Sequence, residues 1–497
     1  MEISCSVWMV LSVILGGLLA FYGILKNGNE LFYVRRLGKM RHLLPPGDMG
    51  WPFIGTQLSF LKAFKSGDPD SFISNFASRF GATGIYRAVM FGKPCVIVTT
   101  PESCKRVLSD DATFGPGFPE SITKLMGKKA FHGISQEEHK RLRRLTTAAL
   151  SGQEALSIYL KHIEEIVKTS LEEWSIMSKP IQFLTEMRKI AFKVIMYVMV
   201  GETSTDHVIM EALEREYTTL NHGLKSMAID LPGFAYHNAL KARKSLQKIF
   251  QGVVDERRLG KLVHKKEEKK DMLDVLMGNE DENGGKLSDE EIVDLIIMFL
   301  NAGHESSGHA AMWAVVLLQD HPEVFQKAKE EQENIVNKRG PNQKGLTLKE
   351  TRQMEYLSKV IDETLRVVNI SFTLFREATK DVNINGFIVP KGWRILPWLR
   401  SAHRDSDKYL NSKEFNPARW DDPKTRANFI PFGAGSRMCP GRDLARLEVY
   451  TFLHYFLLDY KLERINPGCP VRYLPISRPI DNCLAKVTRV SYSTCAI

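Results

Sequence analysis

The chain has 497 residues and a net charge of +10, from 68 Lys and Arg against 58 Asp and Glu. With 43% hydrophobic and 25% charged residues, its composition is that of a globular protein, which excludes intrinsic disorder, collagen and a multi-span membrane protein. Seven cysteines are too few for a disulfide framework in a chain of this length, and they fit a reducing compartment.

The first element that the sequence predicts is a single transmembrane anchor over residues 1–26. The run from Ile3 to Leu25 has no charged side chain, and a helix over it would be about 34 Å long, enough to cross a bilayer core of about 30 Å. A cleaved signal peptide is the alternative, but Glu2, not a basic residue, precedes the run. Basic residues follow the run instead, so the positive-inside rule places the body of the protein in the cytosol.

A stiff connection follows over residues 27–55. It is basic at first and then contains Pro45-Pro46, which favours an extended backbone and fixes the direction of the chain. The predicted organisation is therefore an anchor (1–26), a basic and Pro-rich hinge (27–55) and one large domain (56–497).

The large domain is predicted to be mainly α-helical with a smaller β region. Strand pairs are expected at two places, 84–91 with 95–98 and 382–384 with 387–389. Pro101 marks the first position of a helix. Further helices are expected over 153–177, 181–200, 236–259 and 322–338.

The charged stretch from Lys261 to Lys286 is predicted to be a solvated loop inside the domain. It contains the runs HKKEEKK and NEDENGGK. Its basic residues could contact nucleic acid, but aromatic residues for base stacking are absent and acidic residues are interleaved. No nucleic-acid partner is therefore expected.

The longest predicted helix begins at a capping box, with Ser288 at the cap and Glu291 three positions later, and runs to Gln319. It would be about 46 Å long, and its apolar middle predicts a helix through the centre of a large domain. Polar side chains in that middle are costly unless they are used, so they form a candidate site: Asn301, His304, Glu305 and Ser306.

A zinc site of the H-E-x-x-H type is excluded in this helix. The second histidine, His309, stands five positions after His304, so the two imidazoles would point about 140° apart.

A glycine-rich segment, Phe432 to Gly441, is the second candidate site. Cys439 lies near its end, where a helix begins, and the helix terminus together with Arg437 would lower the pKa of the thiol. Such a thiolate could be a metal ligand or a nucleophile, and a buried inert cysteine is an equally good interpretation from spacing alone. A dinucleotide fingerprint is excluded because Met438 stands where the third glycine is needed. A nucleophile elbow is excluded because Ser436 directly follows Gly435.

The pattern F-x-x-G-x-R-x-C-x-G in this segment resembles the haem-binding loop of the cytochrome P-450 superfamily. Three more of the superfamily's signatures occur in the expected order: Ala302-Gly303-His304-Glu305-Ser306, Glu363-Thr364-Leu365-Arg366 and Phe415-Asn416-Pro417-Ala418-Arg419-Trp420. The resemblance covers essentially the whole chain. It implies the cytochrome P-450 fold, with the long central helix over the haem and a haem-thiolate catalytic domain at 56–497.

The resemblance also implies how a haem b group would be held. Cys439 would be the axial thiolate ligand of the iron, a ligand that favours O–O cleavage. The residues implied around the cofactor are Cys439, Phe432 and Gly433 in the loop, and Arg437, Arg143, His139 and Arg376 for the propionates. His139 stands where the superfamily usually has Trp.

Two further groups receive roles from the resemblance. Glu305 and Ser306 match the acid–alcohol pair that delivers protons to bound dioxygen, with Ser in place of the commoner Thr. Glu363, Arg366 and Arg419 match a buried ion network that supports folding and the haem loop, not catalysis.

Long stretches outside these motifs resemble the plant ent-kaurenoic acid oxidases of gibberellin synthesis, among them 44–55, 210–244 and 301–309. The implied reaction is the multi-step oxidation of ent-kaurenoic acid, an apolar polycyclic diterpenoid acid, to gibberellin A12. It would use O2 and electrons from NADPH through a cytochrome P-450 reductase, at the endoplasmic reticulum membrane. Related plant monooxygenases that oxidise a triterpenoid or sterol skeleton are the alternative. Haem-thiolate isomerases are a second alternative, although they usually lack the acid–alcohol pair.

Family analogy suggests where substrate and reductase would bind. The expected pocket residues are Phe118, Lys124, Leu300, Asn301, Ala302 and Ser371. Asn301 or Lys124 could receive a substrate carboxylate. Because flavoprotein reductases are acidic, Arg442 and Arg446 beside the haem loop are expected on the docking face.

Overall fold

The computed structural model describes residues 2–201, 207–260, 271–282 and 284–490. The chain forms two compact units, and each combines segments that are far apart in the sequence. The first unit contains Met1–Pro119 and Thr373–Ala402, and the second contains Glu120–Phe372 and His403–Ile497. The predicted mainly helical fold with a smaller β region is confirmed.

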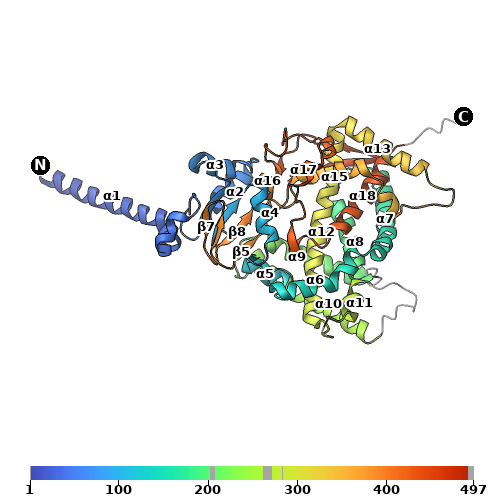
Figure 1. Ribbon diagram of the computed structural model, residues 1–497, viewed down its shortest axis with the longest axis horizontal. Coiled ribbons are helices and arrows are strands. Elements are labelled where there is room, and N and C mark those ends of the chain that lie inside the picture. The colour runs from blue at the N-terminus through green and yellow to red at the C-terminus, as the bar shows by residue number, and fades with distance from the viewer. Residues whose placement is uncertain (1, 202–206, 261–270, 283, 491–497) are drawn as a thin grey trace. The chain divides into compact units, whose positions relative to one another are not determined.

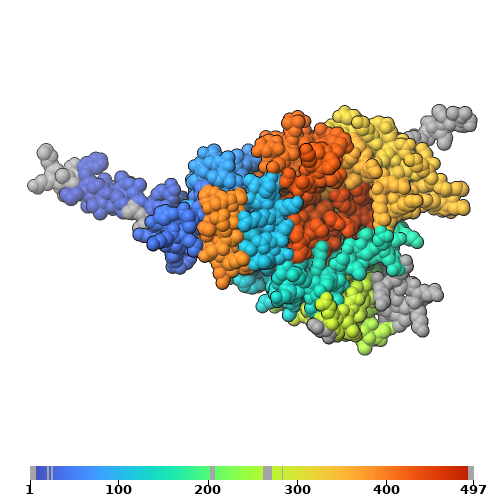
Figure 2. Space-filling model, viewed as in Figure 1, coloured from blue at the N-terminus to red at the C-terminus, as the bar shows by residue number. Residues whose placement is uncertain are grey.

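The first unit is built around a five-stranded sheet with the strand order β1-β2-β8-β5-β3. Strands β2 and β8 are parallel, and the other neighbours are antiparallel. In Figure 2 the late segment around residue 390, in orange, lies against the blue N-terminal part of the chain. The strands of this unit are β1 (Ile85–Met90), β2 (Lys93–Val98), β3 (Phe114–Pro116), β5 (Arg376–Ala378), β6 (Val382–Ile384), β7 (Phe387–Val389) and β8 (Arg394–Pro397). Its helices are α1 (Glu2–Asn29), η1 (Glu30–Val34), η2 (Arg35–Leu43), α2 (Gln57–Lys65), α3 (Ser71–Phe80), α4 (Pro101–Ser109) and α16 (Leu399–His403).

Local sequence explains both predicted strand pairs and the helix that follows the first one. The hairpin β6–β7 turns at Asn385 and Gly386, whose φ angles of 53° and 88° match a two-residue turn of the hairpin type. Helix α4 starts at Pro101, and the side chain of Thr100 accepts a hydrogen bond from the backbone N–H of Ser103. These predictions are confirmed.

Helix α1 forms over the segment predicted as a membrane anchor. In the part of the chain that the structure describes, however, no helix is long and apolar enough to cross a membrane. The transmembrane anchor and the division at residues 26 and 55 therefore stay predictions.

The second unit is mainly helical (Figure 1). Its helices are α5 (Glu120–Met126), α6 (Gln136–Ser151), α7 (Gln153–Ile176), α8 (Phe183–Val200), α9 (His207–Leu224), α10 (Ala235–Arg258), α11 (Met272–Gly278), α12 (Asp289–Asp320), α13 (Pro322–Asn337), α14 (Leu348–Thr351), α15 (Glu355–Val368), η4 (Pro417–Asp421), α17 (Pro423–Arg426), η5 (Gly435–Arg437) and α18 (Arg442–Asp459). Its strands are β4 (Ile181–Gln182), β9 (Tyr460–Arg464), β10 (Val471–Arg472), β11 (Arg478–Pro479) and β12 (Leu484–Arg489). The predicted helices over 153–177, 236–259 and 322–338 are confirmed, and the one over 181–200 begins two residues later, after β4.

Helix α12 is the 32-residue helix through the core of this unit, and it packs against α8 and α18 (Figure 1). Its predicted capping box is present: Ser288 accepts from the N–H of Glu291, and the Glu291 side chain accepts from the N–H of Ser288. Gly308 allows the close approach of α8, because a Cβ atom there would lie 3.2 Å from the carbonyl oxygen of Met187.

The prediction of an unbroken loop from Lys261 to Lys286 is wrong for its second half. Helix α11 forms there because Asp271 accepts a hydrogen bond from the N–H of Asp274 at 2.9 Å. Three apolar side chains of α11 are also buried in the core, Met272, Leu273 and Leu276. Residues 261–270 lie outside the described part of the chain.

Candidate functional site

The glycine-rich segment is a tight loop that ends at the first turn of α18. Gly433 and Gly435 have φ angles of 77° and 73°, a region that glycine adopts without strain. The loop closes on itself through the N–H of Cys439, which donates to the carbonyl oxygen of Phe432 at 2.9 Å. The sulfur of Cys439 is therefore held at the N-terminal end of α18, three residues before Arg442.

The predicted lowering of the thiol pKa is wrong for the protein chain by itself. Burial raises the pKa of Cys439, and the backbone of Gly441 and the charges of Arg143 and Arg442 oppose that rise only in part. The guanidinium of Arg437 donates to Phe131 O at 3.1 Å and to the side chain of Gln136 at 3.1 Å.

The residues beside the sulfur fit a haem group. Arg143 lies on α6, four positions after His139, so both side chains share one face of that helix. Burial lowers the pKa of Arg143, and its Nη1 atom is buried with no hydrogen-bond partner among the described residues. A buried cationic donor without an acceptor suits an anionic group such as a propionate. His139 is buried with its ring 4.9 Å from the ring of Phe131.

The other predicted propionate residues have partners within the chain. Arg437 is bound by Phe131 and Gln136 as described above. Arg376 belongs to the first unit, where it is 3% exposed and donates to Leu108 O at 2.7 Å. Its Nη1 also lies 3.4 Å from the carboxylate of Asp111.

Few side chains in the middle of α12 are accessible to solvent. Ala302 is exposed, Asn301 is half-buried, and the hydroxyl of Ser306 donates to the carbonyl oxygen of Ala302 at 2.9 Å. Leu300 is fully buried in the hydrophobic core, and its predicted place in the substrate pocket stays a prediction.

Glu305 is at the centre of a buried charged cluster. Its Oε1 atom accepts hydrogen bonds from Asn221 at 2.7 Å, from Lys225 at 3.2 Å and from Arg188. Burial tends to raise the pKa of Glu305, but the charges of Lys225 and Arg188 outweigh it and lower the pKa to about 2. The carboxylate is therefore ionised at neutral pH. Ser306 makes its own bond to the helix backbone, so the predicted acid–alcohol pair is not joined by a hydrogen bond in this structure.

The two histidines of α12 add no charge to this cluster. Burial lowers the pKa of His304 to about 3 and that of His309 to about 4. His304 Nδ1 lies 3.1 Å from the hydroxyl of Tyr217, and His309 Nδ1 lies 2.6 Å from the carbonyl oxygen of Glu305. Both rings are neutral at physiological pH.

The structure brings Glu363, Arg366 and Arg419 together in a buried network. Arg366 donates to both carboxylate oxygens of Glu363, at 2.8 and 2.9 Å, and Arg419 donates to the same group at 3.0 Å. The guanidinium of Arg366 also binds three backbone carbonyls, those of His403, Ser412 and Glu414. The network thus ties α15 to the loop that precedes η4.

The remaining predicted pocket residues lie in ordinary positions. Lys124 is more than half exposed and forms an ion pair with Glu120 at 2.9 Å on the same helix, so the structure does not place it as a carboxylate receptor. Phe118 is in the first unit, with its ring 5.5 Å from that of Phe375. Ser371 is exposed after the end of α15.

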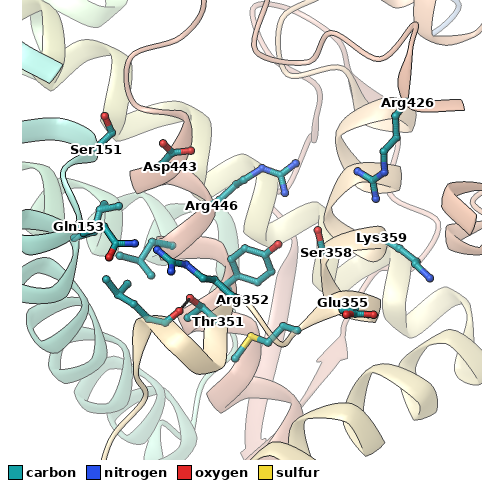
Figure 3. Close-up of a pocket in the computed structure, with 15 residues that line it drawn as sticks. Ser151, Gln153, Thr351, Arg352, Glu355, Ser358, Lys359, Arg426, Asp443 and Arg446 are labelled. Atoms are coloured by element: carbon teal, nitrogen blue, oxygen red, sulfur yellow. Dashed lines mark hydrogen bonds between the residues drawn. The ribbon is translucent and has the colours of Figure 1, made fainter. Parts of the chain in front are cut away.

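A cavity of about 570 Å³ lies between α15, α18 and the junction of α6 and α7, and four of its lining residues are cations (Figure 3). Arg446 and Arg426 both bind the buried carboxylate of Asp362, and the place of Arg446 on a docking face stays a prediction. Arg352 is exposed on the same cavity.

Sequence reasoning missed the partners of Glu305, which are Arg188 on α8, Asn221 on α9 and Lys225 just after α9. The only available signal was a single Arg188 within the largely apolar run of α8.

Comparison with known proteins identifies the family. The profile of the cytochrome P450 family matches residues 45–476. The chain is 57% identical to ent-kaurenoic acid oxidase 2 of Arabidopsis thaliana over 483 residues, 97% of this chain and 98% of the relative. It is 53% identical to 7,8-epoxymelianol synthase of Ailanthus altissima over 485 residues, 97% of both chains. The solved structure of a retinoic acid bound cyanobacterial CYP120A1 superposes with a TM-score of 0.79 at 26% identity, covering 90% of this chain and 99% of that one.

This match implies a haem-thiolate iron cofactor that uses O2 and electrons supplied by a reductase, and the orphaned cation beside the Cys439 sulfur agrees with it. The chain therefore belongs to the cytochrome P450 family, as a monooxygenase.

Proposed function

We propose that this protein is an ent-kaurenoic acid oxidase, which oxidises ent-kaurenoic acid in successive rounds to gibberellin A12. The observation that carries the proposal is 57% identity to such an oxidase over 97% of the chain, well beyond the motif segments. Each round consumes O2 and two electrons that NADPH supplies through the reductase.

The proposed roles of the chain's residues follow from their positions. The sulfur of Cys439 would hold the iron, and Arg143 and His139 on α6 would receive a propionate, with Arg437 as a further donor. When bound, the haem supplies the metal at which O2 is activated.

Ser306 and Glu305 are proposed to move protons. The Ser306 hydroxyl stands on the accessible face of α12 and can pass a proton at its Oγ atom. Glu305 is ionised, so it can accept a proton that arrives through the cluster. Before Glu305 can transfer this proton to Ser306, its carboxylate must separate from Lys225 and Arg188. We propose that breaking these two ion pairs controls the proton transfer.

A triterpenoid substrate is the second candidate. It is favoured by 53% identity, over nearly the whole chain, to 7,8-epoxymelianol synthase. The two candidate substrates differ in charge, because ent-kaurenoic acid carries a carboxylate and a neutral triterpenoid does not. A binding site can distinguish them by this group.

We also propose that the protein works at the endoplasmic reticulum membrane, with the catalytic body in the cytosol. Support comes from the uncharged run of the sequence and from apolar side chains that α1 leaves exposed, such as Trp8 at 70% and Val13 at 72%. Removal of residues 1–26 should release the expressed protein from microsomes. Full retention of that variant would overturn the proposal.

Product identification tests the substrate. The purified protein with reductase and NADPH should convert ent-kaurenoic acid to gibberellin A12, and the Cys439→Ala variant should not. Oxidation of a neutral triterpenoid together with no conversion of ent-kaurenoic acid would favour the second candidate instead.

A further inference from the structure

The cluster around Glu305 contains more positive than negative charge. Lys225 and Arg188 share the single Oε1 atom of Glu305, and burial together with Arg188 and Arg478 lowers the pKa of Lys225. His304 and His309 are neutral, as shown above. One carboxylate therefore faces three neighbouring cations, two of which it binds.

The third cation, Arg478, also has more positive than negative charge around it. Arg478 on β11 is paired across the two-stranded sheet with Arg472 on β10, and like charges directly opposite each other are destabilising. Burial lowers the pKa of Arg478, and repulsion from Arg188 and Arg472 lowers it further, while the charge of Glu305 opposes this shift only in part. In the described part of the chain, no carboxylate lies within ion-pair distance of this half-buried guanidinium.

An unsatisfied donor points to the same place. The Nε atom of Arg188 is buried and has no hydrogen-bond partner among the described residues. Buried donors of native proteins nearly always have an acceptor, and a cationic donor is best satisfied by an anion. The cluster thus lacks one acceptor that carries negative charge.

We infer that Arg478, Lys225 and Arg188 form a receptor for the carboxylate of the substrate. This inference rests on the proposed function, in which the substrate is an apolar acid. The cluster is next to the proposed proton donor, because Glu305 immediately precedes Ser306 on α12. The carboxylate would supply the missing negative charge. A neutral triterpenoid gains nothing from these cations, so the receptor determines specificity for an acid.

The test measures binding with the haem-loaded enzyme, through the shift that a substrate causes in the haem absorption. The ligands are ent-kaurenoic acid and its methyl ester. The Arg478→Gln variant should raise the Kd of the acid about tenfold or more, as for the loss of a charged hydrogen bond, and should change the Kd of the ester less than twofold. Arg478→Lys should restore most of the affinity for the acid.

Lys189→Gln is the matched control. Lys189 follows Arg188 on α8 but is 54% exposed and pairs with Glu186, so neither Kd should change. Equal weakening of acid and ester in Arg478→Gln would assign Arg478 a merely structural role and overturn the inference. An unchanged Kd for the acid would overturn it as well.

Failure of the proposed function gives a different result. If the wild-type protein binds neither ent-kaurenoic acid nor its ester, the same variants are measured with a tricyclic diterpenoid acid, a pentacyclic triterpenoid acid and their methyl esters. A preference for acids that Arg478→Gln removes would keep the receptor and replace only the substrate. Wild-type affinity that is equal for each acid and its ester would overturn the receptor.

Discussion

The carboxyl group of Glu448 on α18 is buried against Ser307 of α12. Burial raises the pKa of Glu448 to about 8, so the folded protein holds a neutral carboxylic acid at this contact at pH 7. It is distinct from Glu305, which is equally buried but is held ionised by two cations. Two glutamates on adjacent helices thus keep opposite protonation states because only one of them has basic neighbours.

The Glu448→Gln variant should be more stable than the wild type at pH 8. The unfolded chain releases this proton near pH 4.5 and the folded protein near pH 8, so wild-type stability falls as the pH rises between these values. An amide removes that loss, and we expect a gain of about 1–3 kcal/mol at pH 8 and little change at pH 5. Thermal unfolding followed by circular dichroism at both pH values measures it. A variant less stable at pH 8 would show that the carboxylate is ionised and bound.

Sequence alone located Glu305 but not its surroundings. An acidic residue in an apolar stretch of a helix can be recognised in the sequence. Because burial of an unpaired charge costs free energy, such a residue is expected to have polar or cationic partners. Those partners, Arg188 and Lys225, are 117 and 80 positions away in the chain, so no local periodicity could indicate them. The same limit explains why Lys124 was a plausible receptor in the sequence and is a surface ion pair in the structure.

At the level of elements, the sequence predicted the start of a helix where a cap precedes a long apolar pattern, and a hairpin where a two-residue turn joins two short strands. The capping box at Ser288 gave the start of α12, and the Asn385-Gly386 turn gave the hairpin β6–β7. Helix α11 was missed because its apolar residues are too few to show a period inside a charged segment.

The network that joins α15 to the following loop predicts a large effect of one substitution. Arg366→Ala would leave the Glu363 carboxylate buried, with Arg419 as its remaining cationic partner, and would free three backbone carbonyls. Loss of one partner of a buried ion pair costs about 3–5 kcal/mol, which is a large part of the stability of a domain. We expect little soluble protein and no haem uptake, measured by the absorbance of the purified fraction.

Lys359→Ala on the same helix is the control for that substitution. Its ion pair with Asp421 is solvent-exposed on the Asp side and should contribute about 0–1 kcal/mol, so expression and haem content should stay near wild type. Normal haem loading of Arg366→Ala would show that the network does not support the fold.

At the scale of the whole molecule, the division into two units could not be predicted from the sequence. Local patterns gave the strands 85–90 and 382–389 but not that β2 pairs in parallel with β8, which is almost 300 positions later. This pairing places Thr373–Ala402 in the first unit. Arg376 therefore belongs to the first unit, and its role toward the haem propionates stays a prediction.

The net charge of +10 and the cationic cavity of Figure 3 lead to a prediction about electron supply. Arg426 and Arg446 are occupied by Asp362, and Lys359 pairs with Asp421, which leaves Arg352 as the exposed cation of this cavity without a carboxylate in the described chain. An acidic reductase would be attracted to it through the solvent.

We therefore expect Arg352→Glu to weaken reductase-driven turnover at low ionic strength. The reductase concentration for half-maximal rate should rise several-fold near 20 mM salt and approach the wild-type value near 500 mM, where the screening length is only a few ångströms. The rate at saturating reductase and the haem content should not change. Arg215→Glu changes the net charge equally but lies on α9 at 75% exposure, so it separates a local effect from a global one. Equal weakening by both variants would assign the effect to net charge, and a wild-type rate independent of salt would rule out electrostatic docking at this surface.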